Sequence, residues 1–398
     1  MKRQLLILLG LALSTSAIAD VPVLPGSQKL NLKAQLGQQL FFDTSLSEPA
    51  GQACASCHDP GHAFTDADKR LATSKGANPD LHGNRNAPTA MYAAYSPRFG
   101  FDKNAGMYIG GQFLDGRAST LSEQAKGPFL NPLEMANPDA EQVVVKVRQA
   151  EYASLFDDVY GTGSLDDAKL AYDRIADAIA EFERSPVLNR FTSKYDFYLL
   201  GKASLSAQER RGLNVFEGGN KGNCAACHPS RPSNGMPPLF TDYSYDNLGI
   251  PRNPDNPFYG LDDEFNAEGM TFVDRGLGER VKSAVDIGKI KVPTLRNIAI
   301  TGPYMHNGYF QTLRGVVNFY SSRDTRNVCG KPLTNETQAL KQRCWPEPEV
   351  GNNVNHAELG ALNLSASEIN DLVAFLKTLT DGYKPESPWP YKAPPKLN

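Results

Sequence analysis

The sequence contains the motif Cys-X-X-Cys-His twice, and this repetition restricts the fold and chemistry of the chain more than any other feature. The two copies are Cys54, Cys57 and His58, and Cys224, Cys227 and His228. Two thiols at this spacing can form thioether bonds to one haem, and the adjacent histidine then reaches its iron. The alternative is a pair of redox or structural dithiols beside incidental histidines. Complete recurrence of the motif favours two covalently bound c-type haems and hence a redox protein.

The N-terminus has the pattern of a cleavable secretory signal. A basic start is followed by an apolar stretch at 5–13, and Ala19 suits cleavage before Asp20. The apolar stretch is too short to span a bilayer as a permanent anchor. We therefore expect residues 1–19 to be a signal peptide and the mature protein to be periplasmic.

Length and charge limit the organisation further. A formal net charge of -3 gives no basic footprint for nucleic acid, and no later apolar run reaches the roughly 18 residues that a membrane span needs. Soluble redox partners are expected instead. A chain of 398 residues is too long for one ordinary core. We predict two domains with one haem each, at 20–185 and 186–398.

Hydrophobic periodicity predicts a mainly α fold with long loops. The clearest apolar faces recur at helical spacing, and Ser206 is a candidate N-cap. The expected helices cover 32–42, 205–216, 141–159, 165–183 and 366–379. Strands are scarce, and Pro and Gly-rich stretches such as 231–260 indicate long loops.

Two cysteines remain outside the haem motifs. Cys329 and Cys344 bracket a polar insert, and a disulfide between them would close a loop of about 15 residues. A redox-active dithiol is the alternative, but neither residue belongs to a Cys-X-X-Cys arrangement. An oxidising compartment favours the structural bridge.

Ordered sequence blocks accompany the two haem motifs. They are LGQQLFF at 36–42, RNAPT at 85–89, DGRA at 115–118, NPLEM at 131–135, VPTLRN at 292–297 and TGPYMHNG at 301–308. With these blocks the chain resembles, over nearly its whole mature length, the bacterial dihaem cytochrome c peroxidase and MauG superfamily. The resemblance implies two mainly helical, cytochrome c-like domains with a haem in each, a calcium ion between them, and peroxide as the oxidant.

The resemblance places Gln124, Pro128 and Glu134 on the distal side of the first haem. Peroxide must lose a proton from one oxygen and gain one on the oxygen that leaves as water, so a group that accepts and returns a proton assists its cleavage. Glu134 is the candidate for this role. Without the resemblance, a solvated surface carboxylate or a helix cap would be the expected role.

The resemblance also identifies the position that decides whether the first iron is open. Some peroxidases of the superfamily carry a blocking histidine there, which leaves only when the other haem is reduced, whereas MauG-like members have none. The corresponding residue is Ser74, a poor haem ligand, so we expect a five-coordinate iron that reacts without activation. His62 and His82 are near in sequence. We expect both to face solvent or to form hydrogen bonds.

The position of the second haem's distal ligand holds Tyr320, whereas peroxidases of the superfamily carry methionine. A phenolate stabilises oxidised iron and a thioether favours the reduced state. The metal charge would lower the pKa of the phenol enough to deprotonate it. The exchange favours MauG-like chemistry. Otherwise Tyr320 would be a core aromatic beside Phe319.

One position departs from the family pattern. Many members place tryptophan before the DGRA block, between the haems, where it conducts oxidising equivalents, but this chain has Leu114. Leucine has no accessible oxidised state. Charge sharing between the irons would then be slower, or would use another aromatic such as Phe113 or Tyr108.

The resemblance assigns calcium ligands as well. They are the side chain of Asn86 and the carbonyls of Thr301 and Pro303, completed by water, which are the oxygen donors that a hard cation prefers. Arg296 and His306 belong to the same blocks. We expect them to support ligands or to contact haem propionates.

These inferences predict a periplasmic, MauG-like dihaem enzyme that uses hydrogen peroxide to oxidise a partner, with a protein side chain as the expected target. Trp345 is a candidate exit point for oxidising equivalents, and core packing is its alternative role. Two other functions stay open. One is a peroxidase that detoxifies hydrogen peroxide with electrons from a small cytochrome c or cupredoxin. The other is a dihaem electron carrier without peroxidase activity.

Overall fold

The structure is a computed structural model that describes residues 30–233, 235–331 and 333–385. The predicted signal peptide at 1–19 lies outside these residues. The described part is mainly helical, as predicted, and its strands are only two or three residues long. None of its helices combines the length and apolar character needed to cross a membrane.

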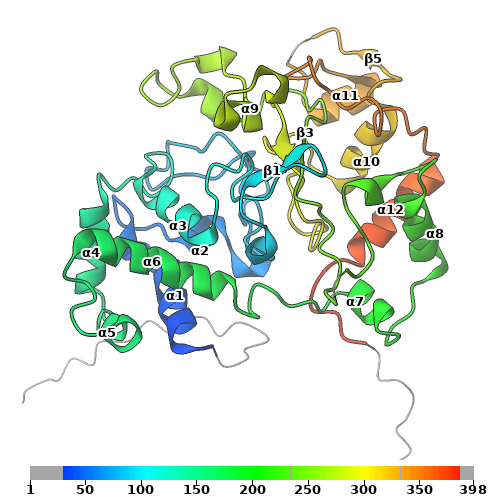
Figure 1. The fold of residues 1–398 in the computed structure, drawn as a ribbon. Coiled ribbons are helices and arrows are strands. Elements are labelled where there is room, and N and C mark those ends of the chain that lie inside the picture. The colour runs from blue at the N-terminus through cyan, green and yellow to red at the C-terminus, as the bar shows by residue number, and fades with distance from the viewer. Residues whose placement is uncertain (1–29, 234, 332, 386–398) are drawn as a thin grey trace, which may run out of the picture.

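Two sets of helices lie side by side (Figure 1). The first set comprises α1 (Leu32–Phe42), α2 (Cys54–Cys57), α3 (Leu121–Leu130), α4 (Ala140–Gln149), α5 (Ser154–Tyr160) and α6 (Ala168–Glu183). The second set comprises α7 (Lys194–Leu199), α8 (Ala207–Glu217), α9 (Gly276–Val281), α10 (Leu313–Ser322), α11 (Glu336–Gln342) and α12 (Ala366–Lys377). Each set has its own apolar core. One core runs from Leu36 to Leu188 in the sequence and the other from Tyr195 to Leu379. The domain boundary after residue 185 stays a prediction.

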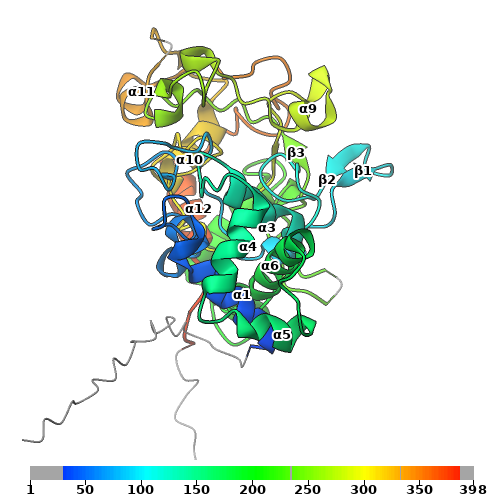
Figure 2. The same ribbon diagram turned by 90° about the vertical axis from the view of Figure 1, so that its left-hand side faces the viewer.

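The strands form three small ladders. Two are antiparallel, β1 (Gly100–Asp102) with β2 (Met107–Ile109), and β3 (Tyr245–Asp246) with β4 (Ile290–Lys291). The third is parallel, β5 (Asn327–Val328) with β6 (Cys344–Trp345). Figure 2 shows the β1–β2 hairpin projecting from the body of the molecule.

Each core is built on a pair of helices that cross at a glycine. A β-carbon on Gly37 of α1 would collide with the backbone of Ala178 in α6, and one on Gly212 of α8 would collide with the backbone of Asp371 in α12. Glycine therefore lets both pairs approach more closely than a larger residue would allow. In each set, the first helix of the pair leads into a haem motif, so this repeated packing positions the two motifs in the same way.

Most of the predicted helices are confirmed. α1 has the predicted bounds, and Ser206 caps α8 by accepting a hydrogen bond from the backbone N–H of Glu209 at 3.2 Å. The prediction of one helix over 141–159 is wrong, because α4 ends at an extended Ala150 and α5 begins afterwards. Val147 and Phe156 are both buried in the same core. Nine residues apart, they would face opposite sides of one straight helix.

Cys329 and Cys344 form a disulfide, and both sulfurs belong to buried residues. The bridge joins residues 15 positions apart. Replacing both cysteines by serine is expected to lower the free energy of unfolding by about 3 kcal/mol, because the unfolded chain regains the loop entropy. Chemical denaturation of the oxidised protein and the double variant measures this difference. An unchanged midpoint would contradict it.

Trp345 follows the disulfide directly and is 2% exposed. Its ring packs edge-on against Phe310 and Phe319, with centroids 5.9 and 5.2 Å away. Its indole N–H donates to the hydroxyl of Ser322 at 3.1 Å. Trp345 is therefore a core residue of the second set. Core packing, the alternative role, therefore suits so buried a side chain better than an exit point for oxidising equivalents.

Candidate dihaem centre

A single cavity of about 490 Å³ is lined by both Cys-X-X-Cys-His motifs. It also collects most of the other predicted site residues. These are Ser74, Asn86, Gln124, Pro128, Glu134, Thr301, Pro303, His306 and Tyr320. Predicted site residues from both sets of helices thus reach one connected space.

The two motif histidines share the same geometry. Nδ1 of His58 lies 3.0 Å from the carbonyl oxygen of Phe64, and Nδ1 of His228 lies 2.7 Å from that of Phe240. A hydrogen bond at Nδ1 fixes the tautomer and leaves Nε2 free for a metal. Burial lowers the pKa of both imidazoles, so the neutral form that ligates iron is favoured. Both histidines therefore fit the role of axial haem ligand.

The four motif cysteines fit haem attachment better than dithiol chemistry. None of them is paired in a disulfide. Burial raises the pKa of Cys54 to about 12 and that of Cys57 to about 11. Redox dithiols need a depressed thiol pKa, because the thiolate is the reactive form. Apolar surroundings of this kind suit thioether links to a haem edge.

Helix α3 and the turn after it carry the residues predicted to lie on the distal side of the first haem. Gln124 and Pro128 lie four residues apart on α3 and therefore share one face. Glu134 follows in a turn held by its backbone N–H, which donates to the carbonyl of Asn131 at 3.0 Å. Desolvation raises the pKa of Glu134, although the positive charge of Arg117 opposes this. A carboxyl with a raised pKa holds a proton more readily than an ordinary glutamate and can both accept and return one.

Ser74 lines the cavity, whereas the two histidines near it in sequence do not. His82 is buried, and its Nδ1 lies 3.3 Å from the carbonyl of Thr73. His62 lies in a short 3-10 turn. Neither is among the residues that line the cavity in the described part of the chain. The hydrogen-bonded state of His82 agrees with the role predicted for it.

Tyr320 lies on α10 and lines the cavity near the second motif. Burial raises its pKa, and the nearby sulfurs of Cys224 and Cys227 would raise it further if ionised. Among the described residues, no group forms a hydrogen bond with the phenol oxygen. This oxygen would therefore be protonated unless a cation binds it, because a bound metal reverses the pKa shift.

The three predicted calcium ligands also line the cavity. Nδ2 of Asn86 donates to the carbonyl of Ala72 at 3.0 Å, which leaves Oδ1 as the ligand atom. The backbone N–H of Asn86 donates to the carbonyl of His306 at 2.7 Å and so ties the two sequence blocks together. The described residues contain no cluster of three or more acidic, His or Cys side chains that could hold a metal. The donors fit calcium in kind, and its binding stays a proposal.

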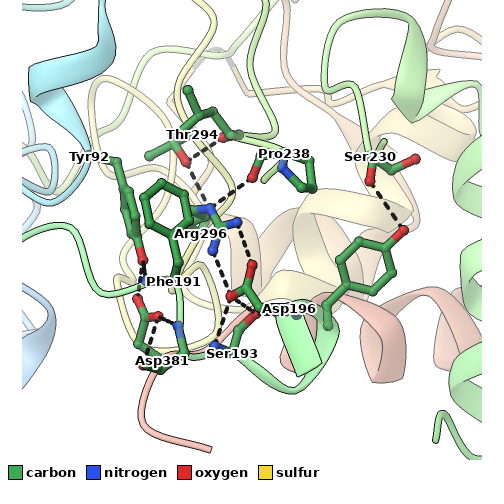
Figure 3. Close-up of polar contacts among 12 residues, drawn as sticks. Tyr92, Phe191, Ser193, Asp196, Ser230, Pro238, Thr294, Arg296 and Asp381 are labelled. Carbon is green, nitrogen blue, oxygen red and sulfur yellow. Dashed lines mark hydrogen bonds and ion pairs between the residues drawn. The ribbon is translucent and has the colours of Figure 1, made fainter. Parts of the chain in front are cut away.

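Arg296 has a different role from the predicted propionate contact. It is 1% exposed, and its guanidinium donates to both carboxylate oxygens of Asp196 at 2.8 and 3.0 Å and to the carbonyl of Pro238 at 2.8 Å. Figure 3 shows this arrangement with Tyr92 and Phe191 beside it. The guanidinium carbon lies 4.9 and 4.5 Å from the centroids of these two rings. These hydrogen bonds anchor Arg296 to Asp196 of α7 and to Pro238, while its packing on the ring of Tyr92 is a contact with the first core.

Glu183 is a site residue that sequence analysis missed. It ends α6, is buried and lines the cavity. Desolvation raises its pKa to about 8. Its sequence signal was a glutamate four residues after Ile179, on the apolar face of the helix. A buried carboxyl of this kind is expected to be largely protonated at neutral pH.

The fold and the cavity define a protein built around two c-type haems. Residues 31–204 match the family model described as di-haem cytochrome c peroxidase. The chain is 42% identical to the methylamine utilization protein MauG of Paracoccus denitrificans (strain Pd 1222) over 356 residues, which cover 87% of this chain and 88% of that protein.

Two further relatives agree. Identity to the cytochrome c peroxidase Ccp of Escherichia coli (strain K12) is 31%, over 92% of this chain and 62% of that protein. The crystal structure of the diheme peroxidase BthA from Burkholderia thailandensis E264 matches with a TM-score of 0.71 and 33% identity, covering 88% of this chain and 86% of that one. The chain belongs to the dihaem cytochrome c peroxidase and MauG family, whose members are peroxide-using oxidoreductases.

Proposed function

We propose that the protein is a MauG-like enzyme that oxidises a partner with hydrogen peroxide and needs no prior reduction. The observation that carries this proposal is the set of residues near the first motif on the predicted distal side of its haem. Gln124 and Glu134 line the cavity there, Ser74 stands where a blocking histidine would be, and His82 is engaged with Thr73. His58 would hold the iron that peroxide meets.

The haems, when bound, supply iron that accepts the oxidising power of peroxide and passes it on in single-electron steps. The chain moves the protons. Glu134 takes a proton from the peroxide oxygen nearer the iron and returns it to the oxygen that leaves as water. Reduction of one peroxide to two waters consumes two electrons and two protons, so the partner loses two electrons.

Tyr320 supports the MauG-like reading for the second site. His228 and Tyr320 would be the axial ligands there, and an anionic oxygen donor lowers the potential of the couple. The redox partner, with a protein side chain as the preferred target, is reached by long-range electron transfer because both motifs lie inside the protein. We also propose that the enzyme works in the periplasm and that Asn86, Thr301 and Pro303 bind calcium.

Leu114 separates this chain from the tryptophan-bearing relatives. It lines the cavity, and its carbonyl accepts a hydrogen bond from the backbone N–H of Lys291 at 2.8 Å. Phe113 beside it lines the cavity as well. Neither side chain is readily oxidised, so we propose that charge moves between the two irons by direct tunnelling.

The test is a titration of the diferric protein with one equivalent of hydrogen peroxide, followed by optical and EPR spectroscopy. Prompt loss of the high-spin ferric signal and a persistent oxidised state are expected. Tyr320→Met should still react but should shorten the life of that state and raise the potential of the second haem. Tyr198→Met, outside the cavity lining, is the control. Reaction only after one-electron reduction would favour the detoxifying peroxidase, and complete inertness would favour an electron carrier.

A further inference from the structure

A second cavity of about 430 Å³ adjoins the dihaem cavity on the side of Glu134. Four residues line both spaces, namely Phe113, Arg117, Asn131 and Glu134. The remaining lining residues of the second cavity are Ala118, Glu123 and Gly127. Residues that face two cavities form the partition between them.

Phe113 packs against Arg117 and against Gly127 in this partition. The guanidinium carbon of Arg117 lies 3.5 Å from the centroid of its ring. A β-carbon on Gly127 would lie only 3.2 Å from Cζ, the outer end of the same ring. The ring thus lies close to helix α3 at Gly127, where an added methyl group would press on it.

The loop that carries Phe113 is fixed at both ends. The backbone N–H of Gln112 donates to the carbonyl of Ala118 at 2.7 Å and closes the base of the loop. A carboxylate oxygen of Asp115 accepts from Arg117 at 2.9 Å and from Arg85 at 2.6 Å. Because Asp115 anchors Arg117, the cation stays over the ring. Arg117 is nevertheless 44% exposed in its side chain, so the outer cavity borders solvent.

We propose that the outer cavity is the access vestibule for the oxidant and that Phe113, which packs against Arg117 and Gly127, is its size filter. A small hydroperoxide passes the ring and meets Glu134, which faces both spaces. A hydroperoxide with a bulky alkyl group is excluded. The vestibule also lets Glu134 exchange protons with solvent between turnovers. This inference rests on the proposed role of the His58 site as the peroxide-binding one.

The test compares small and bulky reagents at the ferric iron. Reaction rates are measured with hydrogen peroxide and tert-butyl hydroperoxide, and association rates with cyanide and 4-phenylimidazole, which bind without turnover. In Phe113→Ala, the preference for the small reagent of each pair is expected to fall by about 10 to 100-fold. Phe113→Leu should give a smaller change in the same direction.

A variant that narrows the passage past the ring gives the opposite test. Gly127→Ala is expected to slow both small reagents by about 3 to 10-fold, because its methyl group presses on the ring. Two matched controls line neither cavity. Phe101→Ala removes an exposed phenylalanine from β1, and Gly100→Ala adds a methyl where no atom lies within 4 Å. Neither should alter the preference.

Unchanged selectivity in both Phe113 variants would overturn the size filter. All rates are measured in the diferric protein and again after one-electron reduction. If the wild type binds cyanide only after reduction, the proposed open iron fails while the filter is still tested in the reduced state. Loss of selectivity in the Phe113 variants, measured in the diferric protein, supports both the open iron and the size filter.

Discussion

Replacing Glu134 by glutamine is expected to slow the reaction of the diferric protein with hydrogen peroxide by about 10² to 10⁴-fold, the usual contribution of a positioned general base. Glutamine keeps the shape of the side chain but cannot accept a proton. The rate of azide association should change far less, because azide is already an anion near neutral pH and needs no base to remove a proton. Stopped-flow absorbance at the haem band measures both rates.

The pH dependence supplies an independent check. Desolvation raises the pKa of Glu134, so its carboxylate form is lost on acidification at a higher pH than for an ordinary glutamate. The peroxide rate of the wild type should fall as the pH drops through that pKa. Glu134→Gln should lack this limb of the profile. Glu141→Gln, an exposed residue of α4, should retain both the rate and the limb. A full rate in Glu134→Gln would assign the proton transfer to another group.

The haem motifs and most helices could be predicted because their signals are local. A Cys-X-X-Cys-His run carries its own ligand geometry, and Ser206 caps α8 through a contact three residues away. The break between α4 and α5 is not local. It depends on Val147 and Phe156 both reaching one core, and this requirement becomes visible only when the helices pack.

Roles that depend on residues far away in the sequence could not be predicted for the same reason. Glu183 lies on the apolar face of its helix, but only the packed structure shows that burial desolvates its carboxyl beside the cavity. Arg296 looked like a haem-contacting cation, but its charge is neutralised by a residue 100 positions earlier. Phe113 and Gly127 gain a common role only because a loop folds onto α3. Spacing predicts bonds along the chain, whereas these roles arise from contacts across it.

Asp196→Ala is expected to destabilise the protein by about 3 to 5 kcal/mol, because it leaves the guanidinium of Arg296 buried without its counter-ion. The two side chains are 4% and 1% exposed. Burial alone would raise the pKa of Asp196, but hydrogen bonds and the charge of Arg296 outweigh it and lower the pKa. The pair therefore contributes stability above the unfolded pKa of the carboxyl, and this contribution is lost as the pH falls through the lower folded value.

Comparison with an exposed ion pair separates the effect of burial on stability from the effect of charge. Asp68 and Arg70 form an ion pair at 2.7 Å, but their side chains are 35% and 88% exposed. Asp68→Ala should therefore lower the free energy of unfolding far less than Asp196→Ala in the same denaturation experiment. The double variant Asp196→Leu with Arg296→Met should be more stable than Asp196→Ala alone, because no unpaired charge is left inside. If Asp196→Ala and Asp68→Ala lowered the free energy of unfolding equally, burial would not increase the contribution of the Asp196–Arg296 pair to stability.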